Sequence, residues 1–242
     1  EVLETKLLTG GSGYDVVVPN GGGARRLGQA GVLRKLDQTQ LKNYGNLDPA
    51  ILVRAAVNDP GNQHAIPYLW GTTGIGYNPD MVEKALGTRT LDSLAAVFDP
   101  AIASKLAKCG ITWLDAPADM VSLALIYLGR PQDSERAEDI AAAEAVLKSA
   151  RPYVRSIDSA QFMSDLASGE VCVSVGWSSA IEQARNRGAQ GETPIDVVYV
   201  IPKEGAPLWC DMVSIPIDAP HPENAYAFLD YLMEPEVIAQ IT

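Results

Sequence analysis

Tryptophan and aspartate side chains stand at two places in the sequence where an apolar run begins or ends. Trp177 closes one run directly after Gly176, and Asp211 follows Trp209 at the start of another. A tryptophan face attracts an organic cation by roughly 0.5–2 kcal/mol, and a shielded carboxylate adds a charge-assisted hydrogen bond of roughly 1.5–3 kcal/mol. These residue types suit a flexible ammonium ligand. Taken singly, each tryptophan favours the simpler interpretation of core packing, because tryptophans are mostly buried.

The overall charge fits a cationic ligand better than an anionic polymer. The 242 residues carry a formal net charge of -11. Nucleic-acid binding needs clustered Lys and Arg, and Arg25-Arg26 is only a pair, so this class of partner is excluded. The acidic composition by itself is equally explained by solubility. No apolar run approaches the ~20 residues that a membrane span needs.

The cysteines and histidines do not form a metal site. The sequence has no CxxC pair and no metal-ligand spacing, since its cysteines and histidines are Cys109, Cys172, Cys210, His64 and His221. A zinc site is therefore not expected, and one disulfide with one free thiol is the simple allocation in an oxidising compartment.

Catalysis and nucleotide binding lack their motifs. Neither Ser178-Ser179 nor Cys210-Asp211 has a neighbouring histidine, and no G-x-S-x-G elbow occurs. The glycine-rich segment 71–76 lacks the G-K-[ST] ending of a phosphate loop. We expect no enzyme activity and no cofactor.

Helical and strand-like segments alternate along the chain, which predicts an α/β fold. Proline at the first helical position marks several helix starts, at Asp48-Pro49, Asn78-Pro79, Asp99-Pro100 and Pro117. The pattern predicts helices over 2–8, 27–36, 50–57, 81–86, 101–108, 120–128, 138–149 and 225–233. It predicts strands over 14–19, 111–114, 171–175, 197–201 and 212–215, with a mobile loop at 20–23 after the first of them.

Two extended segments, 66–78 and 197–205, carry Gly and Pro where a strand could change layer or cross between two bodies. They are candidate hinge strands. A plain strand with a glycine bulge explains the pattern equally well.

The first of these segments also carries a family resemblance. Pro67-Tyr68-x-Trp70-x-Thr72-Thr73-Gly74-Ile75-Gly76-Tyr77-Asn78 resembles the first crossing between lobes in the periplasmic putrescine/spermidine-binding proteins of ABC transporters. Further similar blocks follow in the same order across nearly the whole chain, at 14–19, 109–117, 127–129, 175–177, 201–206 and 225–229.

The resemblance implies a two-lobed periplasmic binding protein of type II, with residues 1–74 and 204–242 in a first lobe and 75–203 in a second. The chain opens without Met and resembles the central portion of such a protein, so we expect it to be a piece of a longer one. The family implies a monomeric, non-catalytic receptor in the periplasm. It would trap a polyamine and deliver it to a permease and its ATPase, and ligand would shift the lobes from open to closed.

The resemblance also assigns ligand-binding roles. Trp177, Trp209 and Asp211 match family residues that contact the polyamine. Asn20 falls where the family has a hydroxyl residue, and its amide oxygen could accept a hydrogen bond from an ammonium group.

Two expected anions are missing, because Ala118 stands where the family usually has a glutamate and Ala180 where it has a carboxylate. An unpartnered buried ammonium costs on the order of 1–3 kcal/mol. We therefore expect either a cation with one charged end, or a polyamine in a changed register with Asp119 replacing the glutamate.

By the same resemblance, Cys109 and Cys172 form a disulfide, and Cys210 stays free. Two reduced buried thiols are the alternative.

Two other functions stay open within this fold. The binding protein could serve a receptor in signalling instead of a permease, which the sequence cannot distinguish. It could also carry another cargo, although an anion conflicts with Asp211 and iron would need a tyrosine and histidine cluster.

Overall fold

The computed structural model describes residues 2–191 and 193–241, and the chain divides into two units. One consists of Glu1–Trp70 and Trp209–Thr242, and the other of Gly71–Leu208. The lobe boundaries expected from the sequence, 1–74 with 204–242 and 75–203, stay a prediction for the whole protein. Among the described residues, none of the helices is long and apolar enough to cross a membrane.

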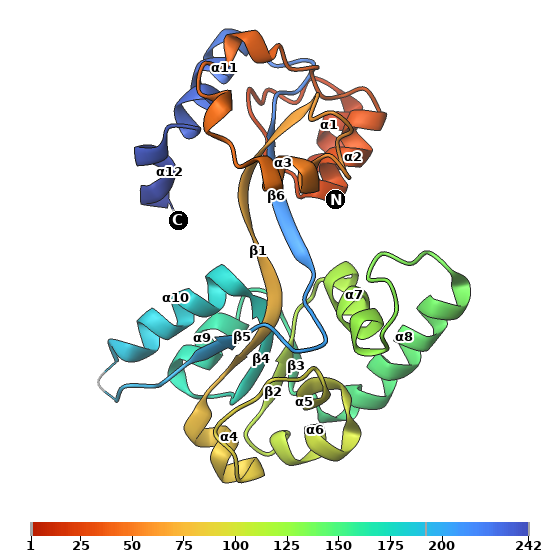
Figure 1. The fold of residues 1–242 in the computed structure, drawn as a ribbon, viewed down its shortest axis with the longest axis vertical. Helices are drawn as coiled ribbons and strands as arrows, with labels where there is room; N and C mark the ends of the chain where they lie inside the picture. Colours follow the sequence, from red (N-terminus) through yellow and green to blue (C-terminus); the bar gives the residue numbers. More distant parts are fainter. Residues whose placement is uncertain (1, 192, 242) are drawn as a thin grey trace. The chain divides into compact units, whose positions relative to one another are not determined.

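The second unit is built on a mixed sheet in the order β3-β2-β4-β1-β5. Its strands are β1 (Ala65–Tyr77), which begins in the first unit, β2 (Ile111–Trp113), β3 (Ser156–Ile157), β4 (Val173–Trp177) and β5 (Val198–Val200). Strand β2 runs parallel to β3 and β4, whereas β1 is antiparallel to β4 and β5. The mixed sheet with helices around it (Figure 1) is the α/β architecture that the sequence predicts.

Helices cover this sheet, and two of them begin where a capping side chain followed by proline predicts. The Asn78 side chain accepts a hydrogen bond from Met81 N, and Asp99 accepts one from Ala101 N. The helices of this unit are α4 (Pro79–Leu86), α5 (Ala95–Phe98), α6 (Pro100–Leu106), α7 (Pro117–Tyr127), α8 (Ala137–Ala150), α9 (Phe162–Ser168) and α10 (Ser178–Ala189).

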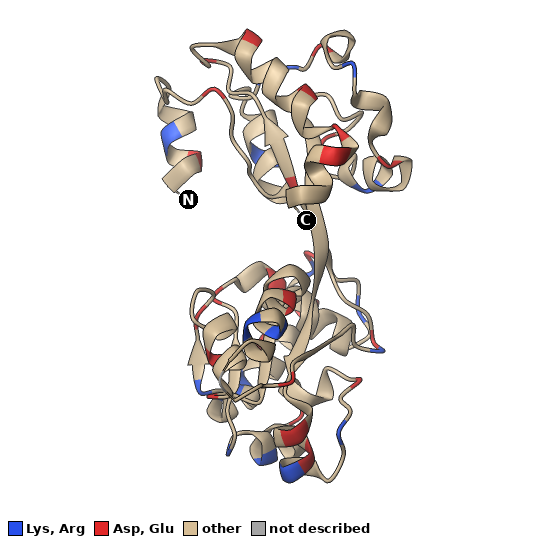
Figure 2. Cartoon of the chain, turned by 90° about the vertical axis from the view of Figure 1, so that its left-hand side faces the viewer, with Lys and Arg blue, Asp and Glu red and all other residues tan. Residues whose placement is uncertain are grey.

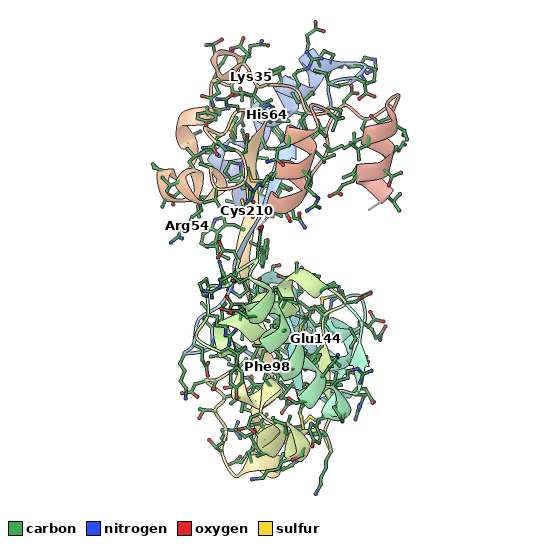
Figure 3. All side chains as sticks on the ribbon, turned by 90° about the vertical axis from the view of Figure 1, so that its right-hand side faces the viewer. Lys35, Arg54, His64, Phe98, Glu144 and Cys210 are labelled. Atoms are coloured by element: carbon green, nitrogen blue, oxygen red, sulfur yellow. A yellow bond between two sulfur atoms is a disulfide. The ribbon has the colours of Figure 1, made fainter. Side chains whose placement is uncertain are left out.

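The core of the second unit is one apolar cluster between the sheet and its helices. Phe98 lies inside it (Figure 3) and packs edge-on against Trp113 at a centroid distance of 5.8 Å. Gly74 lets β1 and β5 approach, because a Cβ there would lie 2.6 Å from the carbonyl oxygen of Val200. This close packing of strands and helices therefore holds the polar side chains at the strand ends in fixed positions.

The first unit pairs β6 (Leu208–Ser214) with β1. Its helices are α1 (Val2–Thr9), α2 (Gly21–Gln29), α3 (Pro49–Ala55), α11 (Pro222–Leu232) and α12 (Pro235–Ile241), with 3-10 turns at Gln38–Gln40 and Tyr44–Asn46. Burial alternates over the first part of β6, where Cys210 and Met212 pack in one apolar cluster of the unit and Asp211 between them is only half-buried. Acidic residues are spread over the helices and loops of both units (Figure 2).

The segment 14–23 differs from the prediction. Residues 14–19 form no continuous strand, and Val17 pairs with Ser214 through an isolated bridge. The predicted mobile loop at 20–23 is wrong, because α2 begins at Gly21 and Asn20 caps it. Glycine is used here for space: a Cβ on Gly21 would lie 2.6 Å from the Asn58 side chain. The predicted helix over 27–36 accordingly starts earlier and ends at Gln29.

Candidate functional site

In the second unit, Asp119 connects two neighbouring strands of the sheet. It lies in the first turn of α7, two residues after the helix-starting Pro117. Thr73 on β1 and Trp177 on β4 are register partners. Thr73 Oγ1 donates to Asp119 Oδ1 at 3.0 Å, and the Trp177 side chain also hydrogen-bonds to this carboxyl group. The structure thus brings the predicted residues Asp119 and Trp177 together.

The Asp119 carboxyl group is held in a state that favours a positive partner. Burial raises its pKa, and the hydrogen bonds from Thr73 and Trp177 offset only part of that effect. Burial penalises the charged form, while each hydrogen bond to the carboxylate favours it. Among the described residues, no Lys, Arg or His side chain forms an ion pair with Asp119. A cation placed next to it would supply the missing compensation.

Trp177 is neither fully buried nor fully exposed. Its ring packs edge-on against Phe162 at 6.1 Å between centroids. Gly176 makes this contact possible, since a Cβ there would lie 2.5 Å from the Phe162 ring. The ring thus takes part in core packing while the residue stays half-buried, and its contact with a ligand remains a prediction.

A group of hydroxyls that the sequence did not suggest lies next to Thr73. Tyr199 OH donates to the Thr72 carbonyl oxygen at 3.0 Å, so the 2.6 Å contact with Thr72 Oγ1 uses the threonine as donor. Thr72 N in turn donates to Ser178 Oγ at 3.3 Å. Burial raises the pKa of Tyr199, which keeps it a neutral phenol. Nothing in the local sequence around Thr72 signals a contact with a residue so distant in the chain.

In the first unit, Trp209 and Asp211 share one face of β6. Side chains alternate along a strand, and the residue between them, Cys210, packs into the core on the other face. Burial raises the pKa of Asp211, and no hydrogen bond from a described residue to its carboxyl group offsets this. The Trp209 indole nitrogen is buried and has no hydrogen-bond partner in the described part of the chain. Among the described residues, the Asp211 carboxyl group and the Trp209 indole N–H therefore both lack a hydrogen-bond partner.

Asn20 pairs with Asp211 through an isolated antiparallel bridge. Its side chain is exposed, but its Oδ1 atom already accepts a hydrogen bond from Gly23 N at 2.8 Å. An amide oxygen has two lone pairs, so one stays available to a ligand. Its role as the cap of α2 explains this residue without any ligand.

The two alanines expected from the sequence to weaken the site lie in helix first turns. Ala118 is exposed at the start of α7, next to Asp119, and Ala180 lies in α10, three residues after Trp177. Neither position has a charge, so Asp119 is the carboxylate that contacts Trp177 in the second unit.

The cysteines are arranged as the resemblance implies. Cys109 and Cys172 form a disulfide with Cα atoms 5.4 Å apart, 63 residues apart in sequence. Cys210 is a buried free thiol, and burial, with a smaller effect from the Asp211 charge, raises its pKa to about 11. It is therefore a packing residue at neutral pH. The described residues contain no group of three or more His, Cys, Asp or Glu side chains that could hold a metal ion.

Two cavities lie away from these side chains. One, of about 200 Å³ in the first unit, is lined mainly by apolar residues at the start of β1 and on α11 and α12. The other, of about 370 Å³ in the second unit, lies between α4 and α6. Neither is lined by a predicted ligand-binding residue.

Comparison with known proteins identifies close relatives. The family model for bacterial extracellular solute-binding proteins matches residues 3–242. The chain is 47% identical over 243 aligned positions to the putrescine-binding periplasmic protein SpuD of Pseudomonas aeruginosa, covering 100% of this chain and 66% of that protein. It is 41% identical to the putrescine-binding periplasmic protein PotF of Escherichia coli, covering 100% and 66%.

Solved structures agree with this likeness. A putative spermidine/putrescine ABC transporter protein from Listeria monocytogenes has a TM-score of 0.82 at 29% identity, covering 99% of this chain and 69% of that one. The spermidine/putrescine substrate-binding protein PotD of Streptococcus pneumoniae has a TM-score of 0.78 at 26% identity, covering 99% and 68%. The chain thus spans about two thirds of the length of its relatives.

Proposed function

Because the chain belongs to the bacterial extracellular solute-binding protein family, we propose that it captures a polyamine or a related organic cation outside the cytoplasm. Its named relatives bind putrescine or spermidine. The proposal extends their ligand class to this chain. Within it, the chain binds its ligand and catalyses no reaction.

One observation carries the proposal: each unit holds a carboxyl group next to an indole, and burial raises the pKa of both carboxyl groups. Asp119 contacts Trp177 in one unit, and Asp211 shares a strand face with Trp209 in the other. An ammonium group would stabilise the charged form of either carboxyl group, and the indole faces would contact the methylene groups and the cation.

The distribution of charge supports a short ligand with few ammonium groups. Asp119 is the carboxylate at Trp177, while Ala118 and Ala180 leave nearby positions without charge. Each additional buried ammonium without an anion would cost on the order of 1–3 kcal/mol. Within this proposal, putrescine, cadaverine and agmatine bind more tightly than spermidine.

The same proposal implies which proteins this chain interacts with. A family member of this kind delivers its ligand to a membrane permease that is driven by an ATPase. The binding protein acts as a monomer outside the cytoplasm, and ligand binding shifts its conformational population.

Calorimetric titration of the full-length protein with putrescine, cadaverine, agmatine and spermidine tests the ligand class. Asp119→Asn and Asp211→Asn should each weaken binding about 10- to 150-fold, the equivalent of one charge-assisted hydrogen bond. Asp133→Asn is the matched control, because Asp133 is exposed on the loop before α8. Absence of heat with all four amines would refute the cation proposal.

A further inference from the structure

A cavity of about 370 Å³ in the second unit is lined by three lysines. They are Lys84 on α4, Lys105 on α6 and Lys108 in the turn that follows α6. Met81, Ala85 and Cys109 complete the lining, which contains no acidic residue. Three positive charges around one cavity contrast with a chain that has 30 acidic and 19 basic residues.

The three lysines have no ionic partner among the described residues. Both acidic residues of α4 are engaged elsewhere, because Asp80 and Glu83 pair with Arg89. Other lysines of this unit do have a carboxylate: Lys148 pairs with Glu144, and Lys203 with Asp92. The ammonium groups around the cavity are therefore available to a ligand.

The backbone beneath the lysines is held firmly. Val82 of α4 and Leu106 of α6 are completely buried in the core. The disulfide joins Cys109, the residue after Lys108, to Cys172 directly before β4. The C-terminal ends of helices attract cations, which accounts for Lys84 at the end of α4 and separately for Lys105 at the end of α6. It does not explain why three lysines line the same cavity.

We propose that this cavity binds a compact soluble anion that carries two or more phosphate or carboxylate groups. Its volume lies within the range of about 300–1,000 Å³ typical of small-molecule sites. Lysine ammonium groups act as point charges that suit compact oxyanions, and Met81, Ala85 and the cystine supply an apolar wall for a short carbon skeleton. The net negative charge does not prevent this, because charges beyond about 8–10 Å are screened at physiological salt.

The cavity is distinct from the residues of the proposed amine site. It lies between α4 and α6, at the end of the second unit away from α7 (Figure 1), and shares no lining residue with the group around Asp119. The anion would therefore bind independently of the amine, and the proposal does not depend on which amine is bound.

Titration of the full-length protein with inorganic pyrophosphate and with citrate, at about 0.15 M salt, tests the site. Heteronuclear NMR should show the backbone amides of residues 84, 105 and 108 shifting in a saturable way. The variant Lys84→Gln, Lys105→Gln, Lys108→Gln should bind about 3- to 150-fold more weakly, because an exposed ion pair changes affinity about 1.4- to 5-fold.

A triple variant of equal charge loss, Lys35→Gln, Lys42→Gln, Lys148→Gln, is the control and should bind like the unmodified protein. Replacing the three cavity lysines by arginine should preserve binding. The proposal is overturned if neither anion produces saturable shifts, if the cavity variant binds as well as the unmodified protein, or if the control loses as much affinity. Circular dichroism of both triple variants verifies that each is folded.

Discussion

Asp211→Asn should stabilise the free protein while it weakens amine binding. Burial raises the pKa of Asp211, and none of the residues that the structure describes compensates its charge by a hydrogen bond or an ion pair. In the free protein the buried negative charge of Asp211 has no partner, so it lowers the free energy of unfolding relative to a neutral side chain at the same position. The isosteric amide removes the charge and leaves the strand pairing of β6 in place.

The pH dependence of this effect follows from linkage. Below the ordinary aspartate pKa of about 3.8, which applies in the unfolded state, Asp211 is protonated in both states and contributes no difference. As pH rises, the unfolded state ionises first, because the folded-state pKa is higher, and stability is lost until the folded state has also ionised. The variant should therefore be more stable than the unmodified protein at neutral pH, and the difference should vanish as pH falls towards 3.8.

The expected magnitude is modest. A fully buried unsatisfied polar group costs about 1–3 kcal/mol, and Asp211 keeps some contact with solvent. A discounted gain of about 0.5–1 kcal/mol corresponds to a rise of about 1–4 °C in Tm for a chain of this size. Loss of the amine contact should weaken binding about 10- to 150-fold.

Thermal unfolding between neutral and acidic pH, together with calorimetry, measures both effects. Asp218→Asn is an informative comparison, because a backbone hydrogen bond from Ser12 lowers the pKa of Asp218. It should lower the Tm at neutral pH, the opposite sign. A lower Tm for Asp211→Asn at neutral pH would show that its charge is already compensated in the free protein, and unchanged affinity would remove Asp211 from the amine site.

Three further outcomes test the packing and electrostatics. Gly176→Ala should lower the free energy of unfolding by about 1–3 kcal/mol, because its Cβ would lie 2.5 Å from the Phe162 ring; an unchanged urea midpoint would contradict this. Replacing Cys109 and Cys172 by alanine should cost about 4 kcal/mol in the chain-entropy model for a 63-residue separation, measured by urea unfolding. Putrescine affinity should fall as pH drops towards the raised pKa of Asp119, since only the carboxylate attracts the amine; identical pH profiles for the unmodified protein and Asp119→Asn would argue against this role.

Local signals in the sequence predicted the starts of α3, α4, α6 and α7. Asp48, Asn78 and Asp99 each cap a helix whose first residue is proline, because side-chain capping and the fixed φ of proline act within a few residues. The strands β2 and β4 and the end of β4 at Trp177 also followed from their apolar runs.

Local signals failed where tertiary packing decided the structure. Three consecutive glycines after Asn20 predict a loop, but they form the first turn of α2, where Gly21 packs so closely that an added Cβ would lie 2.6 Å from the Asn58 side chain. Helix α10 was not predicted, since its sequence is polar and only Ile181, Ala184 and Gly188 are buried.

The sequence by itself determined the helix starts at Asp48, Asn78 and Asp99, because capping acts within a few residues, and the family resemblance implied the pairing of Cys109 with Cys172. The sequence predicted a strand only over 212–215, whereas the structure begins β6 at Leu208, which places Trp209 and Asp211 on one face of that strand. Only the tertiary structure brought Asp119, Thr73 and Trp177 together from α7, β1 and β4. It also gathered Lys84, Lys105 and Lys108 around one cavity. Such groups depend on strand register and helix packing, which join residues far apart in the chain and leave no periodic pattern in the sequence.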